Sequence, residues 1–186
     1  MSPLIVNGRT EKEILKACLQ GDRQAQHDLF YMYAGKMMAV CIRYARHRQE
    51  AEDILQDAFV KVFTNLHTYE HSGSFEGWVR RIIVNTAIKN TLKKSFSHED
   101  IGLEHVVEDY NDPDVFSLMS EEELIKMISD LPDGYKVVFN LYAIEGYSHK
   151  EISEMLGIEE TTSRSQLMKA RRILQSKVNE FYITAV

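Results

Sequence analysis

The sequence predicts an all-α protein of two small helical domains joined by an acidic linker, with sheet minor or absent. Proline and glycine are scarce, at 3 and 9 of 186 residues, and apolar residues recur over long stretches with a helical period. Residues 95–125 hold ten acidic and no basic residues, whereas the flanking parts mix both signs. We therefore expect domains at residues 1–95 and 121–186 and a linker at 96–120.

Composition narrows the class of protein. Hydrophobic residues make up 44% of the chain, as in ordinary globular proteins, and the net charge is −6. The apolar patch from Pro3 to Val6 is too short for a signal peptide or a membrane span, so we expect a cytoplasmic protein. Cys18 and Cys41 form no CxxC pair or zinc spacing, which favours buried, reduced thiols.

The first domain is predicted to be a bundle of four helices, because four stretches show helical periodicity between polar breaks. Their expected bounds are Glu11–Leu19, Asp22 to about Arg46, Gln49–Leu66 and Phe75–Lys94.

The third of these helices carries an acidic, amide-bearing outer face. Its apolar residues recur at helical spacing, which leaves Asp53, Gln56 and Asp57 together on the other side. Such a patch of acceptors suits Arg or Lys on a partner helix, and a merely solvated face is the alternative. A metal site built from His47, Glu50, Asp53 and Asp57 must also be weighed, although the chain has no Glu-x-x-His pair.

A loop with aromatic residues precedes the fourth helix. Aromatic rings beside cations suit unstacked bases, although Phe75 and Trp78 are of types more often found in a core. A polar stripe on the helix can follow a nucleic-acid strand. The candidates in the loop and in the first turn of the helix are Tyr69, His71, Phe75 and Trp78, and the stripe consists of Arg81, Asn85, Lys89 and Lys93.

The second domain begins with helices at Glu121–Ser129 and Pro132 to about Ile144, with Asp130 or Pro132 opening the latter. A helix-turn-helix then follows. Ser148 with Glu151 forms a capping box, and Gly157 suits a left-handed C-cap. The second helix is expected from Thr161 to about Val178, with Thr161 or Thr162 as its cap.

This second helix has a basic face, with five Lys or Arg and no acid between residues 161 and 178. The first turn of such a helix reaches base edges, while later cations hold phosphates. A two-helix core unit with a solvated basic face is the alternative. The candidates for base contacts are Thr162, Ser163, Arg164 and Gln166, and those for phosphates are Lys169 and Arg172.

Taken together, these motifs resemble the extracytoplasmic-function sigma factors over almost the whole chain. The resemblance is carried by residues 51–59, residues 75–87, Leu131-Pro132 and the helix-turn-helix from Tyr147 to Arg172. It implies no enzyme activity, no metal and no cofactor. It also implies a first domain of the region-two type and a second of the region-four type.

The resemblance implies partners for each surface. Asp53, Gln56 and Asp57 would dock on core RNA polymerase, and residues 69–75 would capture a flipped base of the −10 element. Thr162, Arg164, Ser165, Gln166 and Lys169 would read the −35 element, with Arg171 and Arg172 on the DNA backbone. The acidic linker would run through the polymerase cleft.

This sequence departs from the commonest family pattern at Gln166, where Arg is frequent, and at Thr161, where Gly is frequent. The preferred −35 bases therefore cannot be transferred.

We interpret the chain as a sigma factor that directs promoter-specific initiation of transcription. We also expect an anti-sigma factor to bind it and hold it inactive. The rival interpretations are a stand-alone helix-turn-helix regulator, which the net charge of −6 disfavours, and a carboxylate-bridged metalloprotein.

Overall fold

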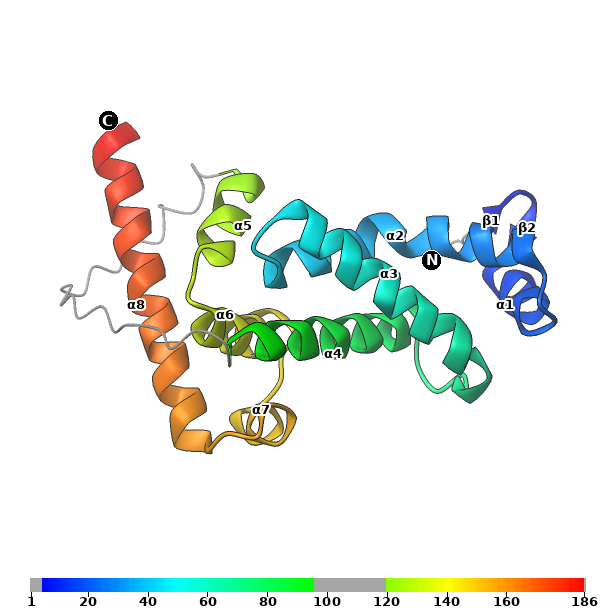
Figure 1. Cartoon of the computed structure of the whole chain (residues 1–186). Helices are drawn as coiled ribbons and strands as arrows, with labels where there is room; N and C mark the ends of the chain where they lie inside the picture. The colour runs from blue at the N-terminus through cyan, green and yellow to red at the C-terminus, as the bar shows by residue number, and fades with distance from the viewer. Residues whose placement is uncertain (1–4, 96–119, 186) are drawn as a thin grey trace. The chain divides into compact units, whose positions relative to one another are not determined.

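Helices form nearly all of the computed structural model, which describes residues 5–95 and 120–185 (Figure 1). The all-α prediction is confirmed, and within the described residues the sheet is confined to one short hairpin. The chain divides into two compact units, residues 1–89 and 90–186, with the boundary inside the fourth helix. The predicted linker lies outside the described residues except for Ser120.

The hairpin at the N-terminus is an element that the sequence interpretation missed. Strands β1 (Ile5–Val6) and β2 (Arg9–Thr10) pair antiparallel around Asn7 and Gly8. Both turn residues have positive φ, at 52° and 76°. Asn-Gly is the preferred pair for such a two-residue turn, so the signal was present in the sequence.

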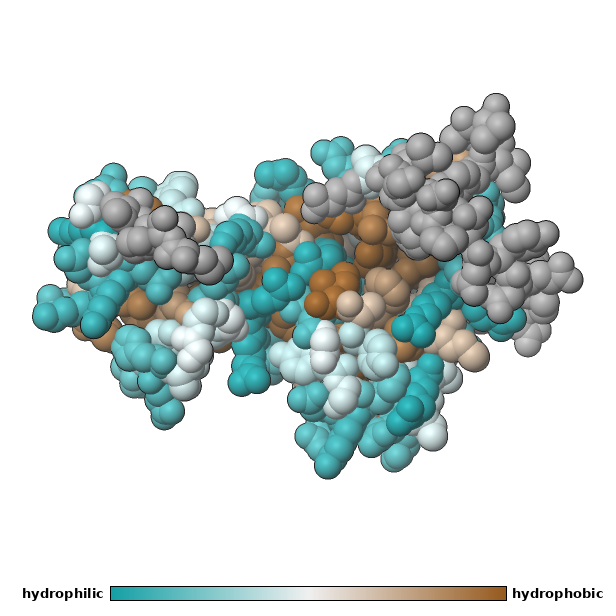
Figure 2. All heavy atoms as spheres, turned by 180° about the vertical axis from the view of Figure 1, so that it is seen from behind, coloured by the Kyte–Doolittle hydropathy of each residue, from teal (hydrophilic) through white to brown (hydrophobic). Residues whose placement is uncertain are grey.

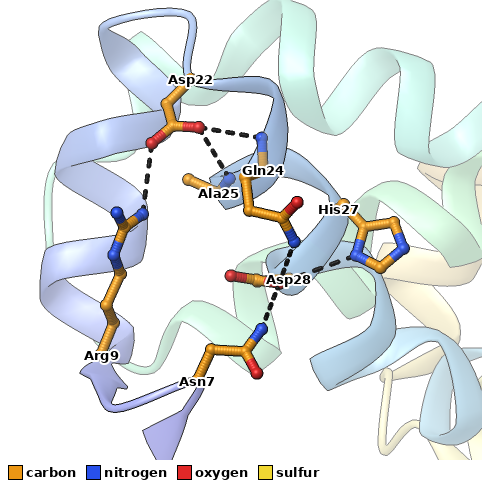
Figure 3. Close-up of polar contacts among 7 residues, drawn as sticks. All are labelled: Asn7, Arg9, Asp22, Gln24, Ala25, His27 and Asp28. Atoms are coloured by element: carbon orange, nitrogen blue, oxygen red, sulfur yellow. Dashed lines mark hydrogen bonds and ion pairs between the residues drawn. The ribbon is translucent and has the colours of Figure 1, made fainter.

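Two polar contacts hold the hairpin against the second helix, α2 (Figure 3). The Asn7 side-chain amide donates to buried Asp28 at 2.9 Å, and Gln24 donates to the same carboxylate oxygen at 3.0 Å. Arg9 pairs with Asp22 at 3.2 Å. Because Asp28 is 2% exposed, these amide bonds supply the partners that a buried carboxylate requires.

Unit 1 contains the first three predicted helices and most of the fourth, and their bounds agree with the prediction to within about two residues. Thr10 forms a capping box with Glu13, and the Asp22 side chain accepts from two backbone amides of the next helix. A short 3₁₀ turn, η1 (Leu66–Thr68), follows the third helix. The helices are α1 (Glu11–Leu19), α2 (Arg23–Tyr44), α3 (Arg48–Asn65) and α4 (Phe75–Ser95).

The core of unit 1 consists of apolar side chains that these helices bury at helical spacing. Each buried side chain of this size contributes roughly 1.5–3 kcal/mol through removal of apolar area from water. The largest fully buried residues are Ile14, Leu29, Tyr33, Met37, Tyr44, Ile54, Phe75 and Ile83.

Unit 2 begins with α5 (Glu121–Ser129), which Ser120 opens through a capping box. The next helical stretch has the predicted span, but its last five residues differ in type. It runs as α6 (Asp133–Phe139) and then widens into a π-helical segment, η3 (Asn140–Ile144). The amide of Glu145 donates to the carbonyl five residues back, at 2.9 Å, which is the π-helical bond.

The helix-turn-helix comprises α7 (His149–Leu156) and α8 (Glu160–Ala185). The predicted Ser148 capping box and the left-handed Gly157, with φ of 67°, are both confirmed. The predicted threonine cap of α8 was wrong, because the Ser163 amide already bonds to the Glu159 carbonyl at 3.0 Å. The helix also continues past Val178, since no Gly or Pro interrupts residues 179–185.

The two cysteines are free and buried, as predicted. Burial raises the pKa of Cys18 to about 11 and that of Cys41 to about 12, so both thiols stay protonated at neutral pH. Among the described residues, no helix combines the length and the apolar character that a membrane crossing requires.

Candidate functional surfaces

The acidic face of α3 is exposed as predicted. Asp53, Gln56 and Asp57 are all exposed, while most apolar residues of the same helix are buried. One turn further on, Val60 is 65% exposed on the same side of the helix. Within the described part of the chain, the three polar side chains have no hydrogen bond or ion pair. They are therefore available to a partner.

The four residues of the metal alternative do not converge. Glu50 is buried, and its carboxylate accepts the Arg46 amide at 2.8 Å, whereas Asp53 and Asp57 face solvent. The His47 ring nitrogen accepts the Glu50 amide at 3.2 Å and so caps α3. No group of three or more His, Cys, Asp or Glu among the described residues is placed to hold a metal ion.

Aromatic rings pack together beneath and beside the loop that precedes α4. The Tyr69 ring lies 5.1 Å from Phe75 and 5.6 Å from Trp78, and Phe75 stacks on Trp78 at 5.5 Å. Beneath them, Phe75 meets Tyr33 of α2 at 5.5 Å. Phe75 is only 2% exposed, so the expectation that its ring serves as a base platform is replaced by a core role.

The loop itself has a defined backbone. The Tyr69 hydroxyl donates to the Gly73 carbonyl at 2.9 Å, and Ser74 caps α4 by accepting the Gly77 amide at 3.1 Å. His71 adopts a left-handed φ of 58°. Its exposed ring lies 4.7 Å from the Tyr69 ring. Among the aromatic candidates, His71 is exposed and Tyr69 and Trp78 are half-buried, so these three offer ring surface to a base.

Polar contacts link the helices whose aromatic rings lie beside this loop to each other and to α1. The Tyr33 hydroxyl donates to Glu11 of α1. Burial is the main cause that raises the pKa of Tyr33, and this hydrogen bond raises it further. Lys36 of α2 pairs with Glu76 in the first turn of α4 at 2.7 Å. These contacts join α1 to α2 and α2 to α4, and the Tyr33 ring also packs against Phe75 in the first turn of α4.

The polar stripe of α4 faces solvent where the structure describes it. Arg81, Asn85 and Lys89 are exposed at successive turns, while Val79 and Ile83 are buried. The fourth predicted member, Lys93, belongs to α4, but its side chain lies outside the described part. The three described members can contact consecutive phosphates of one strand.

Exposed cations and hydroxyls lie on the outer face of α8. Hydrophilic residues also cover the α7 end of this unit (Figure 2). Arg164 is exposed and pairs with Glu160 at 3.2 Å. Gln166 is half-buried, and its side chain packs closely against Gly134 of α6. A β-carbon added to Gly134 would lie only 3.3 Å from the amide nitrogen of Gln166. The other exposed candidates are Ser165, Lys169, Arg171 and Arg172, and Thr162 is half-buried.

Ser163 differs from the other candidates on α8. Its side chain is 0% exposed, and its hydroxyl lies 2.9 Å from the Nδ1 atom of His149 on α7. A buried hydroxyl cannot reach a base edge, so this member of the predicted base-contacting set is corrected to a core position. Its spacing to Leu167 and Ala170, both buried, already places it on the apolar face.

Sequence reasoning also missed a cluster where α7, α8 and η3 meet. The His149 ring stacks on Tyr142 at 4.5 Å and 21°, and the Arg171 guanidinium lies 5.8 Å from the Tyr142 ring centre. Burial, and then the nearby Arg164, lower the pKa of His149 against the opposing effect of Glu160. The histidine is therefore neutral at neutral pH. Met168, 54% exposed on α8, was also missed.

Comparisons with known proteins cover both units. Residues 29–96 match the family described as Sigma-70 region 2, and residues 121–174 match Sigma-70, region 4. The extracytoplasmic-function RNA polymerase sigma-E factor of Haemophilus influenzae is 29% identical, over 91% of this chain and 95% of the relative. The corresponding sigma factor SigW of Bacillus subtilis is also 29% identical, over 91% of this chain and 97% of its own.

A solved structure shares the fold. The sigma factor RpoE of Bartonella quintana, determined in complex with the anti-sigma factor NepR, is 17% identical. It matches 81% of this chain and 94% of its own with a TM-score of 0.51.

Proposed function

Because the chain belongs to the extracytoplasmic-function family of RNA polymerase sigma factors, we propose that its two units contact separate promoter elements. As a sigma factor, the chain binds core RNA polymerase and directs promoter-specific transcription initiation. We assign polymerase docking and the −10 element to residues 1–95, the −35 element to residues 121–186, and the connection to residues 96–120. The observation that carries this assignment is that one chain presents an acidic face, a cationic stripe behind an aromatic loop, and a basic helix-turn-helix.

Asp53, Gln56 and Asp57 form the proposed docking face for core polymerase. They are exposed and have no hydrogen bond or ion pair among the described residues, so docking breaks no intramolecular bond. Charge-assisted hydrogen bonds from Arg or Lys of the polymerase would stabilise the complex. Val60 adds an apolar contact at the end of this face.

The proposed −10 surface is the loop with Tyr69, His71 and Trp78, together with the stripe of Arg81, Asn85 and Lys89. Stacking on the exposed rings offsets the few kcal/mol that unpairing a base costs. The stripe then holds the freed strand by its phosphates. Phe75 supports the loop from the core.

The proposed −35 surface lies on the outer face of α8. Arg164 and Ser165 are exposed near its first turns, where base edges come within reach, with Thr162 and Gln166 partly exposed beside them. Lys169, Arg171 and Arg172 lie further along and would contact phosphates. Ser163 is excluded by its burial.

A sigma factor of this family is expected to have a regulatory partner and to act in a particular compartment. We propose an anti-sigma factor as a regulatory partner, by resemblance to the family, and the cytoplasm as the compartment, because core polymerase and promoter DNA are there. The chain acts by binding and carries out no catalysis of its own. A stand-alone regulator is not favoured, because such a protein has no use for the sigma region 2 to which residues 29–96 match.

The test of the function is run-off transcription from a library of promoters with randomised −10 and −35 elements. Core RNA polymerase supplemented with this chain is expected to initiate at a discrete subset, whereas core polymerase alone does not. Duplex binding without initiation would support the stand-alone regulator instead. The selected promoters supply the probes for the experiments that follow.

Replacing Arg164 and replacing Arg172 are expected to have different effects on DNA binding, because the first is proposed to contact a base and the second a phosphate. Arg164→Ala should cost about 5-fold to 150-fold for the preferred base at one −35 position, the value of one bidentate base contact, and relax selection there. Arg172→Ala should weaken all duplexes alike and reduce the salt slope by about 0.9. Titration of the holoenzyme with single-position variants of the selected duplex measures both. A uniform loss from Arg164→Ala would contradict its base-reading role.

Replacing two cations of the α4 stripe should reduce the salt dependence of strand binding. Arg81→Ala with Lys89→Ala removes two phosphate contacts, so the slope of log affinity against log salt should fall by about 1.4. The probe is the single-stranded non-template −10 segment of a selected promoter, bound to the holoenzyme. Lys12→Ala with Lys16→Ala removes two exposed cations from α1 and should leave the slope unchanged. Equal slopes for both pairs would refute the stripe.

A further inference from the structure

We propose that His149 is a positioning residue that holds the recognition helix α8 at two points along its length. The proposal rests on the assignment of the −35 element to α8. His149 itself lies on α7, and its ring joins Ser163 on one side to Tyr142 on the other. The Arg171 guanidinium lies over the Tyr142 ring. The stacked rings of His149 and Tyr142 therefore connect Ser163, near the start of α8, to Arg171 further along the same helix.

The first point is the bond between the His149 ring and Ser163. The Ser163 hydroxyl is fully buried and lies 2.9 Å from the Nδ1 atom of His149. A hydroxyl buried without a partner is costly, so a polar group in this position selects the pose of α8 that satisfies it. The bond joins residues 14 positions apart on the two helices of the motif.

The second point is the contact between the Arg171 guanidinium and the Tyr142 ring. Tyr142 belongs to the π-helical η3, and its ring lies nearly parallel to that of His149, with 21° between the planes. The Arg171 guanidinium lies 5.8 Å from the centre of the same tyrosine ring, within the range of a cation–π contact. The stack on His149 thus orients the ring that receives a phosphate-binding arginine.

The two points lie on either side of most of the residues proposed to contact bases. Ser163 and Arg171 are about 12 Å apart along the helix axis, at 1.5 Å per residue. Arg164, Ser165 and Met168 lie between them and are exposed. Contacts at two separated points fix the tilt of a helix as well as its position. Base readout tolerates deviations of only about 0.5 Å and 10–20°. A buried Ser163 hydroxyl left without its partner, or loss of the second point, is therefore expected to degrade discrimination between bases.

The decisive variants separate the ring from its nitrogen. His149→Phe keeps the stack on Tyr142 but leaves the Ser163 hydroxyl without its partner. We expect the affinity of the holoenzyme for the selected −35 duplex to fall about tenfold, within the range for one unsatisfied buried hydroxyl. Adding Ser163→Ala removes that hydroxyl, so the double variant should recover to within about threefold of the original. Ser163→Ala alone should cost less, because water can reach the half-buried His149.

Two further measurements distinguish positioning from a general loss of stability. The ratio of affinities for the selected and a scrambled duplex should fall in His149→Phe, while affinity for the scrambled duplex stays the same. Tyr142→Ala alters a side chain that is 36% exposed, so the fold should tolerate it, and it should lower the same ratio. Thermal unfolding of each full-length variant verifies that it is folded at the assay temperature.

Each outcome decides between the alternatives. Unchanged discrimination in His149→Phe and Tyr142→Ala would overturn the positioning role, as would a double variant no better than His149→Phe. If the unmodified chain selects no upstream element from the library, the −35 assignment fails and this proposal fails with it. A chain that selects an element while both variants keep full discrimination overturns the positioning role alone.

Discussion

Replacing Asp53, Gln56 and Asp57 together by alanine is expected to abolish promoter-dependent transcription while leaving the fold intact. The three side chains are exposed and have no hydrogen bond or ion pair within the described residues, so unfolding should be unaffected. Hydrogen bonds to charged groups contribute about 1.5–3 kcal/mol each, and their losses are not fully additive. We therefore expect at least about a 100-fold loss of affinity for core polymerase. Competition for core polymerase against unmodified chain measures it.

A matched control removes the same chemistry elsewhere. Glu122, Glu154 and Gln49 are also exposed, and their joint replacement by alanine takes away two carboxylates and one amide without touching the docking face. This control variant should transcribe as well as the original. If both triple variants lose affinity alike, overall charge governs the association and the docking face is wrongly placed. If neither does, another surface carries the contact.

Val60 gives a finer version of the same test. An apolar side chain 65% exposed beside an acidic patch is typical of an interface whose centre excludes water. Val60→Ala removes little area and should weaken docking only a few-fold, about 1 kcal/mol. Val60→Asp places a charge at the same point and should weaken docking more.

The sequence predicted the helices well because periodicity and caps are local signals. Ser148, Glu151 and Gly157 determine the bounds of α7 through contacts with their own neighbours, and those contacts appear as expected. The acidic face of α3 was predictable for a similar reason. Its exposed members are simply the residues that the apolar stripe leaves over.

The surfaces were predicted less completely, because burial depends on partners distant in sequence. Ser163 has a polar side chain, yet its register places it with Leu167 in the core, and its acceptor comes from another helix. Phe75 likewise belongs with Val79 and Ile83 by spacing, although its place beside a loop suggested exposure. For Ser163, helical register predicted burial where residue type did not, and for Phe75 register and residue type agreed on burial against its position beside the loop.

The π-helical segment η3 had no recognisable signal in the sequence. Apolar residues continue through Asn140–Ile144 with a spacing compatible with an ordinary helix. The widening follows from how the chain closes onto the turn, where Tyr147 donates to the Leu141 carbonyl at 2.9 Å. Its consequence, the placement of Tyr142 beside His149, could therefore not be predicted.

The second large effect is expected from His71→Gly, which should impair promoter opening without destabilising unit 1. A non-glycine residue in the left-handed region costs roughly 1–2 kcal/mol, and His71 has φ of 58°. Glycine adopts this conformation freely but gains entropy in the unfolded chain, so the two effects offset each other. What the change removes is an exposed ring 4.7 Å from Tyr69.

Loss of that ring should weaken capture of the flipped −10 base. Base–aromatic stacking contributes about 1–3 kcal/mol per base, so open complexes should decrease about 5-fold to 100-fold. Permanganate reactivity of unpaired thymines at a selected promoter measures opening, and affinity for the closed −35 duplex should stay unchanged. His71→Asn, which tolerates the left-handed backbone but lacks a ring, should fail in the same way. Normal opening by both variants would leave the half-buried Tyr69 and Trp78 as the rings that receive the base, because Phe75 is buried.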